Sequence, residues 1–439
     1  MGVFKKGDKK VENAWAMYDW ANSVYHLVIT STIFPIYYTS VTTTASGKVN
    51  FFGFDFVPDA LYVDALSFAF LVIAAISPFL SGIADYRGNK KSFMKFFCYM
   101  GALSCSAMFF FNATNLWLGI LLVIFACIGY AGSIVFYNAY LPEIVEPQEQ
   151  NRVSAKGFSL GYIGSSILLI ANLVMVLKPS LIGLSGPDAV GAATRWSFIT
   201  VGVWWILFAQ ITFYYLPTNP FGEVRKNEGH SIWHGYQELR KVWNLLRETK
   251  RLRRFLIAFF VYNTGVRTIM LVANLFGSDT LHLKTAELIG TILIIQFVAV
   301  GGAFLFSFIA KKKGDIYMLK IATFIWIGAC IGAYFTYTAL HFYALAFVVG
   351  VVMGGIQALS RSTYSKLLPE TEDHASFFSF YDVLENVGSV LGLFLCGWVI
   401  QLTGSMRNSV VFLLVFFVLG FIFLNRVPAP PESSPSGRT

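Results

Sequence analysis

The sequence predicts an all-α polytopic membrane protein, and three observations indicate this fold class. Hydrophobic residues make up 56% of the 439-residue chain and charged residues only 13%, whereas a soluble domain carries roughly 25% charged residues. Apolar runs of about 20 residues, the length that a helix needs to cross a bilayer, recur from one end of the chain to the other. Lysine and arginine gather in the short segments between these runs, as in the cytoplasmic loops of membrane proteins.

Twelve transmembrane helices are expected from the positions of the apolar runs. Six lie in the first half of the chain, at residues 15–42, 60–84, 92–112, 116–139, 157–177 and 195–216. Six lie in the second half, at residues 254–277, 286–310, 316–338, 342–365, 376–402 and 408–425. We therefore expect an N-terminal six-helix lobe at residues 1–216, a C-terminal six-helix lobe at 254–425 and a disordered Pro/Ser-rich tail at 426–439.

The segment between the lobes, residues 217–253, is the longest polar stretch and contains a predicted amphipathic helix. In HSIWHGYQELRKVWNLLRETKRLRR, apolar side chains recur at helical spacing and basic residues fill the opposite face. A helix of this kind lies along a membrane surface. The segment can equally be no more than the linker between the two lobes.

The distribution of basic residues predicts that both termini are cytoplasmic. With this orientation, most of the 33 lysine and arginine residues fall on the cytoplasmic side. The exceptions are Lys48, Lys178, Arg195, Lys284 and Arg407 on the other side, and Arg267 within a span. The net charge of +9 is therefore explained by membrane orientation, and we expect no nucleic-acid partner.

No residue cluster in the sequence indicates an enzyme, a metal or a cofactor. The five cysteines lie in apolar runs without CxxC spacing, and the six histidines are scattered, so neither a zinc site nor a disulfide framework is expected. The chain has no G-x-x-x-x-G-K-[ST] loop, so we do not expect transport powered by ATP bound to this chain.

Two short repeats relate the halves of the chain. IADYRGN at 83–89 resembles IAKKKGD at 309–315, and LPE at 141–143 recurs at 368–370. Both pairs fall in corresponding loops of the two predicted lobes. Two six-helix repeats are the plan of transporters whose lobes move about a binding site at the membrane midplane.

Polar residues inside the predicted spans indicate where this site lies. Asp19, Asn22 and His26 share one helical face of the first span, and Asp382 and Glu385 lie on a polar face of the eleventh. Arg267 lies about 20 Å along its helix from the basic cluster at the helix start, at 1.5 Å per residue. A charge at that depth costs roughly 2.5–3.5 kcal/mol, so it must face a partner or a watery cavity.

We therefore assign candidate roles to these side chains. Arg267 is the expected anchor for a solute carboxylate. The other expected substrate contacts are hydrogen bonds from Asn263, Gln296 and Gln357 and a cavity wall formed by Tyr18, Trp20 and Tyr262. His26, Asp382 and Glu385 are the candidates for proton coupling, because their ionisation can change with exposure to water.

Each assignment has a structural alternative. Asp19 can cap the helix or pair with a cytoplasmic base, and Asp382 and Glu385 can form ion pairs that hold the lobes together. His26 can be a hydrogen-bonded residue of the helix bundle. Arg361 can extend to the membrane interface or pair with Glu370.

The loop GIADYRGNKK, residues 82–91, has the form G-x-x-x-D-x-R-G-x-K-K. It resembles the loop signature between the second and third helices of the major facilitator superfamily. Gly82 allows close helix approach and Gly88 the turn, and an ion pair involving Asp85 and Arg87 is expected to latch the lobes in the outward-facing state. Asp19, Asn22 and Arg361 complete the candidate gate. Lys311 replaces the aspartate in the second copy, so a latch there should differ or be absent.

Longer motifs narrow the resemblance. WAMYDWANSVY, NAYLPEI, GFSLGYIG, GGIQALSRSTYSKLLPE and FFSFYDV occur in this order and resemble the vacuolar effluxer branch of that superfamily, the autophagy-related permeases and their bacterial relatives. The resemblance implies a twelve-helix facilitator and, for the fungal members, export of amino acids from the vacuole. In the seventh span this chain reads YNTGV, with Thr264 where the branch usually has an aspartate.

Together these observations predict a secondary active transporter that moves a small polar solute, an amino acid or related organic anion, by alternating access and in the direction of export. Its expected partners are the solute, the lipid bilayer and coupling protons, and we expect a monomer. The compact length suggests a bacterial inner membrane. The alternatives are a non-transporting scaffold or receptor with the same fold, and a carrier of drugs or sugars.

Overall fold

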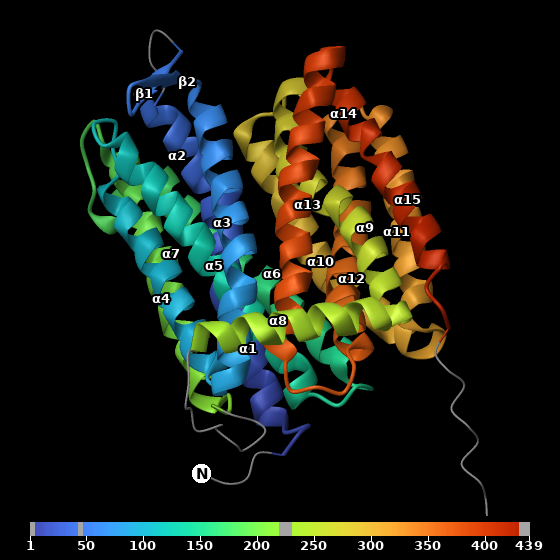
Figure 1. Cartoon of the computed structure of the whole chain (residues 1–439). Helices are drawn as coiled ribbons and strands as arrows, with labels where there is room; N and C mark the ends of the chain where they lie inside the picture. The colour runs from blue at the N-terminus through green and yellow to red at the C-terminus, as the bar shows by residue number, and fades with distance from the viewer. Residues whose placement is uncertain (1–4, 43–46, 219–230, 430–439) are drawn as a thin grey trace, which may run out of the picture.

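The computed structural model describes residues 5–42, 47–218 and 231–429. Its helices form two bundles that lie side by side (Figure 1). The first bundle contains α1 Lys9–Val24, the π-helix η1 Tyr25–Thr30, α2 Ile33–Thr42, α3 Pro58–Arg87, α4 Lys90–Ala107, η2 Met108–Phe110, α5 Leu116–Ile144, α6 Gln150–Leu177, η3 Pro179–Ile182 and α7 Ala189–Tyr215.

The second bundle follows α8 Ser231–Glu248. It contains α9 Lys250–Leu275, the π-helix η4 Phe276–Thr280, α10 Thr285–Lys313, α11 Asp315–Tyr334, α12 Ala339–Leu367, α13 His374–Thr403, α14 Met406–Phe412 and α15 Leu414–Asn425. Residues 219–230 of the predicted linker and 430–439 of the predicted tail lie outside the described residues.

The predicted fold class, an all-α polytopic protein, is confirmed. Eleven helices of the described chain are long and apolar enough to cross a membrane. The remaining predicted span, residues 15–42, is not one continuous α-helix, because the structure divides it among α1, η1 and α2. At this interruption the Thr32 hydroxyl donates to the Leu27 carbonyl at 2.6 Å. Such π-turns occur frequently at functional sites.

Different secondary-structure elements lie at the two ends of the molecule. At one end, strands β1 Val49–Phe51 and β2 Phe54–Phe56 form an antiparallel hairpin, turned by Phe52 and Gly53, which both have positive φ. We call this the hairpin end. At the opposite end, α8 lies across both bundles (Figure 1), with Trp243 against Phe380. We call this the linker end.

A strip of glycines lets two helices of the first bundle approach closely. A Cβ added at Gly157 or Gly161 of α6 would collide with Asp19 or Ser23 of α1, and one at Gly164 would collide with the Trp20 ring. Small residues spaced in this way are typical of tightly packed membrane helices. The close packing fixes α1, which supplies part of the site described next.

Candidate functional site

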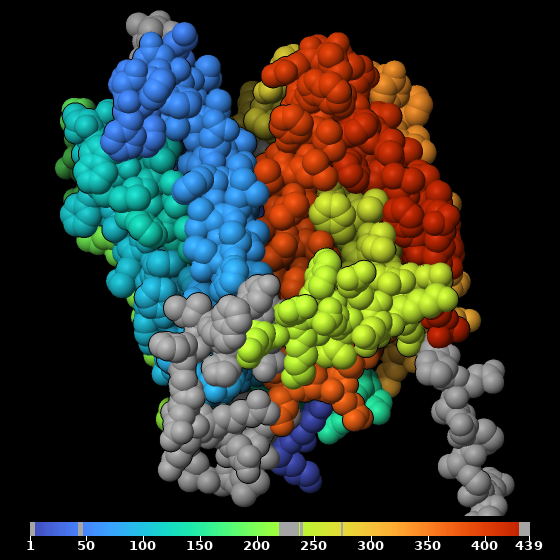
Figure 2. Space-filling model, viewed as in Figure 1, coloured from blue at the N-terminus to red at the C-terminus, as the bar shows by residue number. Residues whose placement is uncertain are grey.

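A cavity of about 1800 Å³, its open mouth included, lies between the two bundles. Figure 2 shows the groove between them widening toward the hairpin end. Its lining includes the ionisable side chains Asp19, His26, Arg267, Arg361, Asp382 and Glu385 and the amides Asn138, Asn263, Gln296, Gln357 and Asn386. The polar residues that the sequence analysis selected from separate spans therefore meet around one space.

Arg267 reaches this cavity from the middle of α9. Its guanidinium donates to Glu385 of α13 with an N–O distance of 2.9 Å, and Asn263 lies 3.5 Å from the same carboxylate. The Arg267 side chain keeps 28% of its surface exposed and that of Glu385 keeps 16%. Arg267 therefore already binds a carboxylate while remaining open to the cavity.

A second acid lies one helical turn before Glu385. Asp382 is 4% exposed and lines the cavity, yet its buried Oδ2 has no hydrogen-bond partner in the described part of the chain. Further along the same face, Asn386 and Ser389 also line the cavity. The polar face predicted for the eleventh span is thus directed toward the cavity.

Three further predicted residues line the cavity from other helices. The His26 ring stacks on Tyr130, with 6.4 Å between ring centroids. Gln357 accepts a hydrogen bond of 2.5 Å from the Tyr162 hydroxyl, which joins α12 to α6 of the other bundle. Gln296, from α10, is 8% exposed.

An ion pair between the bundles forms the floor of the cavity at the linker end. Both terminal nitrogens of Arg361 lie 3.1 Å from Asp19 Oδ2, and Tyr137 donates to the same oxygen at 2.8 Å. The guanidinium also donates to the Ser154 hydroxyl and carbonyl at 3.0 Å. Since Arg361 and Asp19 are only 3% and 5% exposed, the pair is a buried contact between the bundles beside the cavity.

The structure contradicts the structural alternative for Arg361 and agrees in part with that for Asp19. Arg361 neither extends to an interface nor pairs with Glu370, because it is enclosed by the Trp15, Tyr137 and Phe158 rings at 4.1–5.5 Å. Asp19 does pair with a base, but that base belongs to the opposite bundle. We call Asp19, Arg361 and Ser154 the central gate.

Besides the central gate, a buried cluster of charged side chains connects the bundles at the linker end. We call this cluster the first latch. Asp85 of α3 accepts hydrogen bonds from the backbone N–H groups of Ala375 and Ser376, at 3.2 and 2.7 Å, where α13 begins. Lys90 lies 3.6 Å from Asp85 and pairs with Glu143. Glu143 in turn contacts His374 Nδ1 at 3.1 Å. The first latch consists of Asp85, Lys90, Glu143 and His374.

The prediction that Arg87 takes part in the ion pair of Asp85 is wrong. Arg87 is exposed, and Lys90, from the same loop motif, supplies the positive charge. Gly88 ends α3 in the left-handed conformation with φ 64°, as the turn requires. Gly82 is buried within α3.

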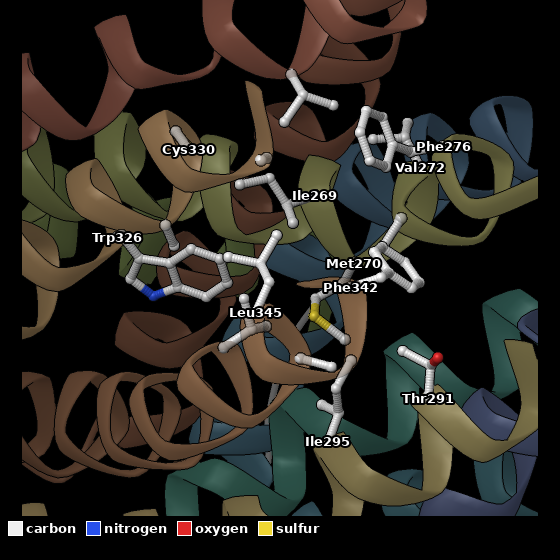
Figure 3. A pocket seen from close by; sticks show the side chains of 16 residues that line it. Ile269, Met270, Val272, Phe276, Thr291, Ile295, Trp326, Cys330, Phe342 and Leu345 are labelled. Carbon is white, nitrogen blue, oxygen red and sulfur yellow. The ribbon is translucent and has the colours of Figure 1, made fainter. Parts of the chain in front are cut away.

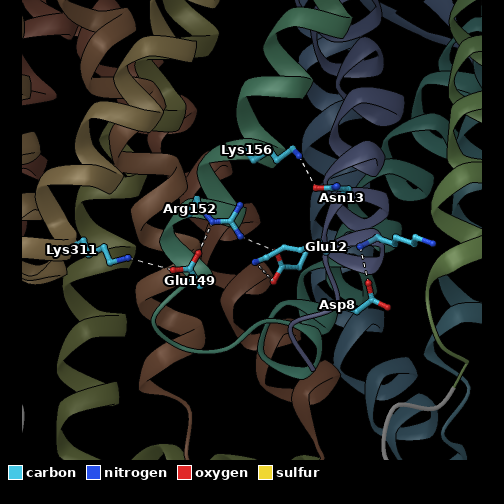
Figure 4. Close-up of polar contacts among 9 residues, drawn as sticks. Asp8, Glu12, Asn13, Glu149, Arg152, Lys156 and Lys311 are labelled. Atoms are coloured by element: carbon cyan, nitrogen blue, oxygen red, sulfur yellow. Dashed lines mark hydrogen bonds and ion pairs between the residues drawn. The ribbon is translucent and has the colours of Figure 1, made fainter. Parts of the chain in front are cut away.

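The corresponding connection of the second repeat, the second latch, uses different residues. Lys366 pairs with Asp315 at 2.8 Å and donates to Asn151 of α6 at 2.7 Å. Beside it, Lys311 lies 3.4 Å from Glu149, whose pKa is held below its usual value by a hydrogen bond from Arg152. Figure 4 shows Lys311 and Glu149 meeting from opposite bundles. The bundles are therefore connected at this position too, by residues other than those of the first repeat, although Lys311 replaces the aspartate.

Four predicted residues lie away from the cavity. Tyr18 is fully buried against Tyr137 and Phe213. Trp20 stacks on Trp204. The buried Tyr262 hydroxyl shares a hydrogen bond of 2.7 Å with Ser360, and Asn22 is 1% exposed within the first bundle. The first three do not form the expected wall, because neighbouring helices cover them.

A separate apolar pocket lies within the second bundle. It has a volume of about 560 Å³, and Met270, Ala273 and Ile295 line both this pocket and the central cavity. Figure 3 shows Met270 and Ile295 across the pocket from Trp326. The side chains that line this pocket are almost all apolar.

Comparison with known proteins identifies the family. Residues 7–431 match the family described as vacuole effluxer Atg22 like. The chain belongs to this family. The uncharacterized MFS-type transporter YxiO of Bacillus subtilis is 33% identical over 427 residues, which are 95% of each chain. Autophagy-related protein 22 of Saccharomyces cerevisiae is 29% identical over 420 residues, 83% of this chain and 77% of that protein.

Solved structures show the same fold for this Atg22-like protein. The E. coli fucose:proton symporter FucP is 13% identical with a TM-score of 0.67, covering 96% of this chain and 98% of that chain. The human organic anion transporter MFSD10 is 12% identical with a TM-score of 0.68, covering 96% and 100%. The protein is thus a multi-pass membrane protein of the major facilitator fold, and the resemblance stated from its motifs is confirmed.

Sequence reasoning missed several residues of the site and gate. Ser154 and Tyr137 are common residue types within apolar helices and lie outside the quoted motifs, whereas Tyr162 had a signal, because it belongs to GFSLGYIG. Glu143 had a signal, because it ends the LPE repeat. Lys90 had a signal as well, because it belongs to the same loop motif, GIADYRGNKK, from which Asp85 was predicted.

Proposed function

We propose that this protein is a secondary active transporter that moves a small polar solute by alternating access between its two bundles. The solute carries a carboxylate and is an amino acid or a related organic anion. The contact between Arg267 and Glu385 carries this proposal. It supports a carboxylate site because a protein carboxylate already occupies the guanidinium, 2.9 Å away, inside a cavity large enough for a solute.

The gates support the alternating part of the mechanism. The central gate and both latches join the bundles at the linker end, while the cavity widens toward the hairpin end (Figure 2). Moving solute to the linker side requires these contacts to break and the bundles to close at the other end. In this scheme Gln296, Gln357 and Asn263 orient the solute by hydrogen bonds.

The placement of basic residues supports a cytoplasmic linker end, with both termini in the cytoplasm of a bacterial cell. The described conformation is then outward-facing. A monomer suffices, because one chain supplies the whole lining of the cavity. The export expected from the family resemblance refers to a vacuole, whose lumen corresponds topologically to the cell exterior. The same movement across a cell membrane brings solute into the cytoplasm.

Flux in proteoliposomes tests the proposal. Wild type, Arg267→Ala and Arg253→Ala would be compared for exchange of a labelled amino-acid mixture. Arg253 is an exposed arginine of the same helix, so its variant controls for loss of charge. We expect exchange in wild type and Arg253→Ala and at least a tenfold loss in Arg267→Ala.

Exchange by Arg267→Ala at the wild-type rate would remove Arg267 as the anchor. Absence of exchange in folded wild type, with sugars or cationic drugs moving instead, would support the alternative solute classes. Absence of any flux would support a non-transporting scaffold or receptor.

A further inference from the structure

The carboxylates that line the cavity outnumber the guanidiniums. The described lining carries three carboxylates, Asp19, Asp382 and Glu385, against two guanidiniums, Arg267 and Arg361. Asp19 is engaged by Arg361 in the central gate, and Glu385 is engaged by Arg267. Asp382 is left over, 4% exposed and with an oxygen that has no hydrogen-bond partner among the described residues. A buried carboxylate needs compensation, so the cavity is balanced only when it holds one cation.

Binding of an organic anion increases this imbalance, and binding of a zwitterionic amino acid leaves it unchanged. Glu385 occupies Arg267 in the empty cavity, so an incoming carboxylate must take that contact from it. Glu385 is then released one helical turn from Asp382. Two unpaired carboxylates at this spacing repel each other and favour binding of a proton.

We propose that Asp382 and Glu385 form a proton-binding site that fills when the solute binds, so that solute and proton cross the membrane together in the same direction. The inference rests on the proposed function, because it requires a solute carboxylate at Arg267. The proton comes from water at the open hairpin end and binds a Glu385 carboxylate oxygen as Arg267 turns to the solute. It leaves to water at the linker end after the bundles have moved.

The surroundings of the two acids favour a proton over a metal cation. Asn263 directs its amide N–H₂ toward Glu385, and the Ser389 hydroxyl donates to the Glu385 backbone carbonyl. The Asn263 group that meets the Glu385 carboxylate is therefore an N–H donor, which does not coordinate a metal cation. The titratable or charged side chains that line the cavity from the other helices are Asp19 of α1, Tyr25 and His26 of η1, Tyr130 of α5, Tyr162 of α6, Arg267 of α9 and Arg361 of α12.

Proton movement coupled to solute movement tests this site. Proteoliposomes would contain a pH-sensitive dye, and labelled amino-acid counterflow without gradients would first establish that the carrier works. Solute added to the side facing the hairpin end should then acidify the interior of wild-type vesicles. In Glu385→Gln and Asp382→Asn, the number of protons moved per solute should fall at least tenfold, whatever the absolute rate. Glu370→Gln, at an exposed acid outside the cavity, should keep the wild-type ratio.

The outcomes separate this inference from the proposed function. Counterflow without proton movement, or with protons moving against the solute, overturns proton symport while leaving the carrier in place. Accumulation driven by a sodium gradient alone also overturns it. Wild type that shows neither counterflow nor solute-dependent proton movement refutes the proposed function and the inference with it.

Discussion

The two latches at the linker end occupy corresponding places in the two repeats but differ in burial. In the first latch, the Lys90, Asp85 and Glu143 side chains are 5%, 0% and 0% exposed. In the second, Lys366 and Asp315 are 22% and 17% exposed, and Lys311 is 67% exposed. The same loop position therefore supports a buried charge cluster in one half and a solvated ion pair in the other.

This difference predicts unequal energetic roles. Removing one partner of a buried charge pair leaves the other charge uncompensated, whereas an exposed pair is screened by water. The first latch and the central gate should therefore hold the linker end closed, while the second latch contributes little. Closure can be measured by maleimide labelling of Ala155→Cys, because Ala155 is fully buried and packs in a cluster with Ala303 and Ala358 of the other bundle. All five native cysteines are buried.

The largest effect is expected at the central gate. Asp19→Ala leaves the buried Arg361 guanidinium without its carboxylate, which typically costs about 3–5 kcal/mol. Labelling of the introduced cysteine from the linker side should accelerate more than a hundredfold. The double variant Asp19→Ala/Arg361→Met removes both charges and should recover much of the closure. Equal labelling in the single and double variants would mean that the pair does not hold the gate.

A smaller but clear effect is expected at the first latch. Lys90→Met leaves Asp85 and Glu143 as buried acids, at a cost of about 2–3 kcal/mol, since the N-terminus of α13 still compensates Asp85. Lys91→Met is the matched control, because Lys91 donates to the Leu216 carbonyl and pairs with no carboxylate among the described residues. Cysteine labelling and the detergent melting temperature should change in the first variant and not in the second. Equal changes in both would contradict a specific role for the buried lysine.

For most contacts of the site, the sequence predicted one of the two residues but not its partner. Helical rise and the cost of buried charge placed Arg267 at the midplane, and the loop motif identified Asp85. The partner of Arg361 is 342 positions away in sequence, and no local pattern links two such residues. Only the packing of the bundles brings them together.

Side-chain direction was harder to predict than depth. Trp20 follows Asp19 directly and is therefore rotated by about 100° around the helix. Asp19 faces the cavity, whereas Trp20 faces Trp204 within the first bundle. An aromatic residue in a span has apolar surroundings on every side, so composition does not indicate which neighbour it packs against. The assignment of Tyr18, Trp20 and Tyr262 to the wall failed for this reason.

An intermediate effect is expected when the central gate is crowded without removal of a charge. A methyl group at Gly157 would collide with the Asp19 carboxylate and crowd Arg361, and overpacking of this kind costs about 1–3 kcal/mol. Gly157→Ala should therefore accelerate labelling less than Asp19→Ala does. Gly397→Ala is the control, since a Cβ there meets nothing within 4 Å. Unchanged labelling in Gly157→Ala would show that Asp19 can move aside without weakening its contact with Arg361.

The smallest effect is expected at the second latch. Lys366→Ala removes a partly exposed pair that water screens in part, and surface pairs are worth about 0–1 kcal/mol. Labelling should change less than fivefold, and its dependence on salt should decrease. A change as large as that of Lys90→Met would refute the assignment of closure to burial.

A substitution in the second repeat tests whether a latch depends on burial or on the aspartate of the loop motif. Lys311→Asp restores the aspartate of the loop signature in the second repeat, but Lys311 is exposed and faces Glu149. An aspartate at this position would meet a like charge instead of a helix N-terminus. The variant should therefore weaken closure slightly. Stronger closure would mean that the motif residue creates a latch wherever it stands, whereas the structure attributes the first latch to the buried lysine and the helix start that surround Asp85.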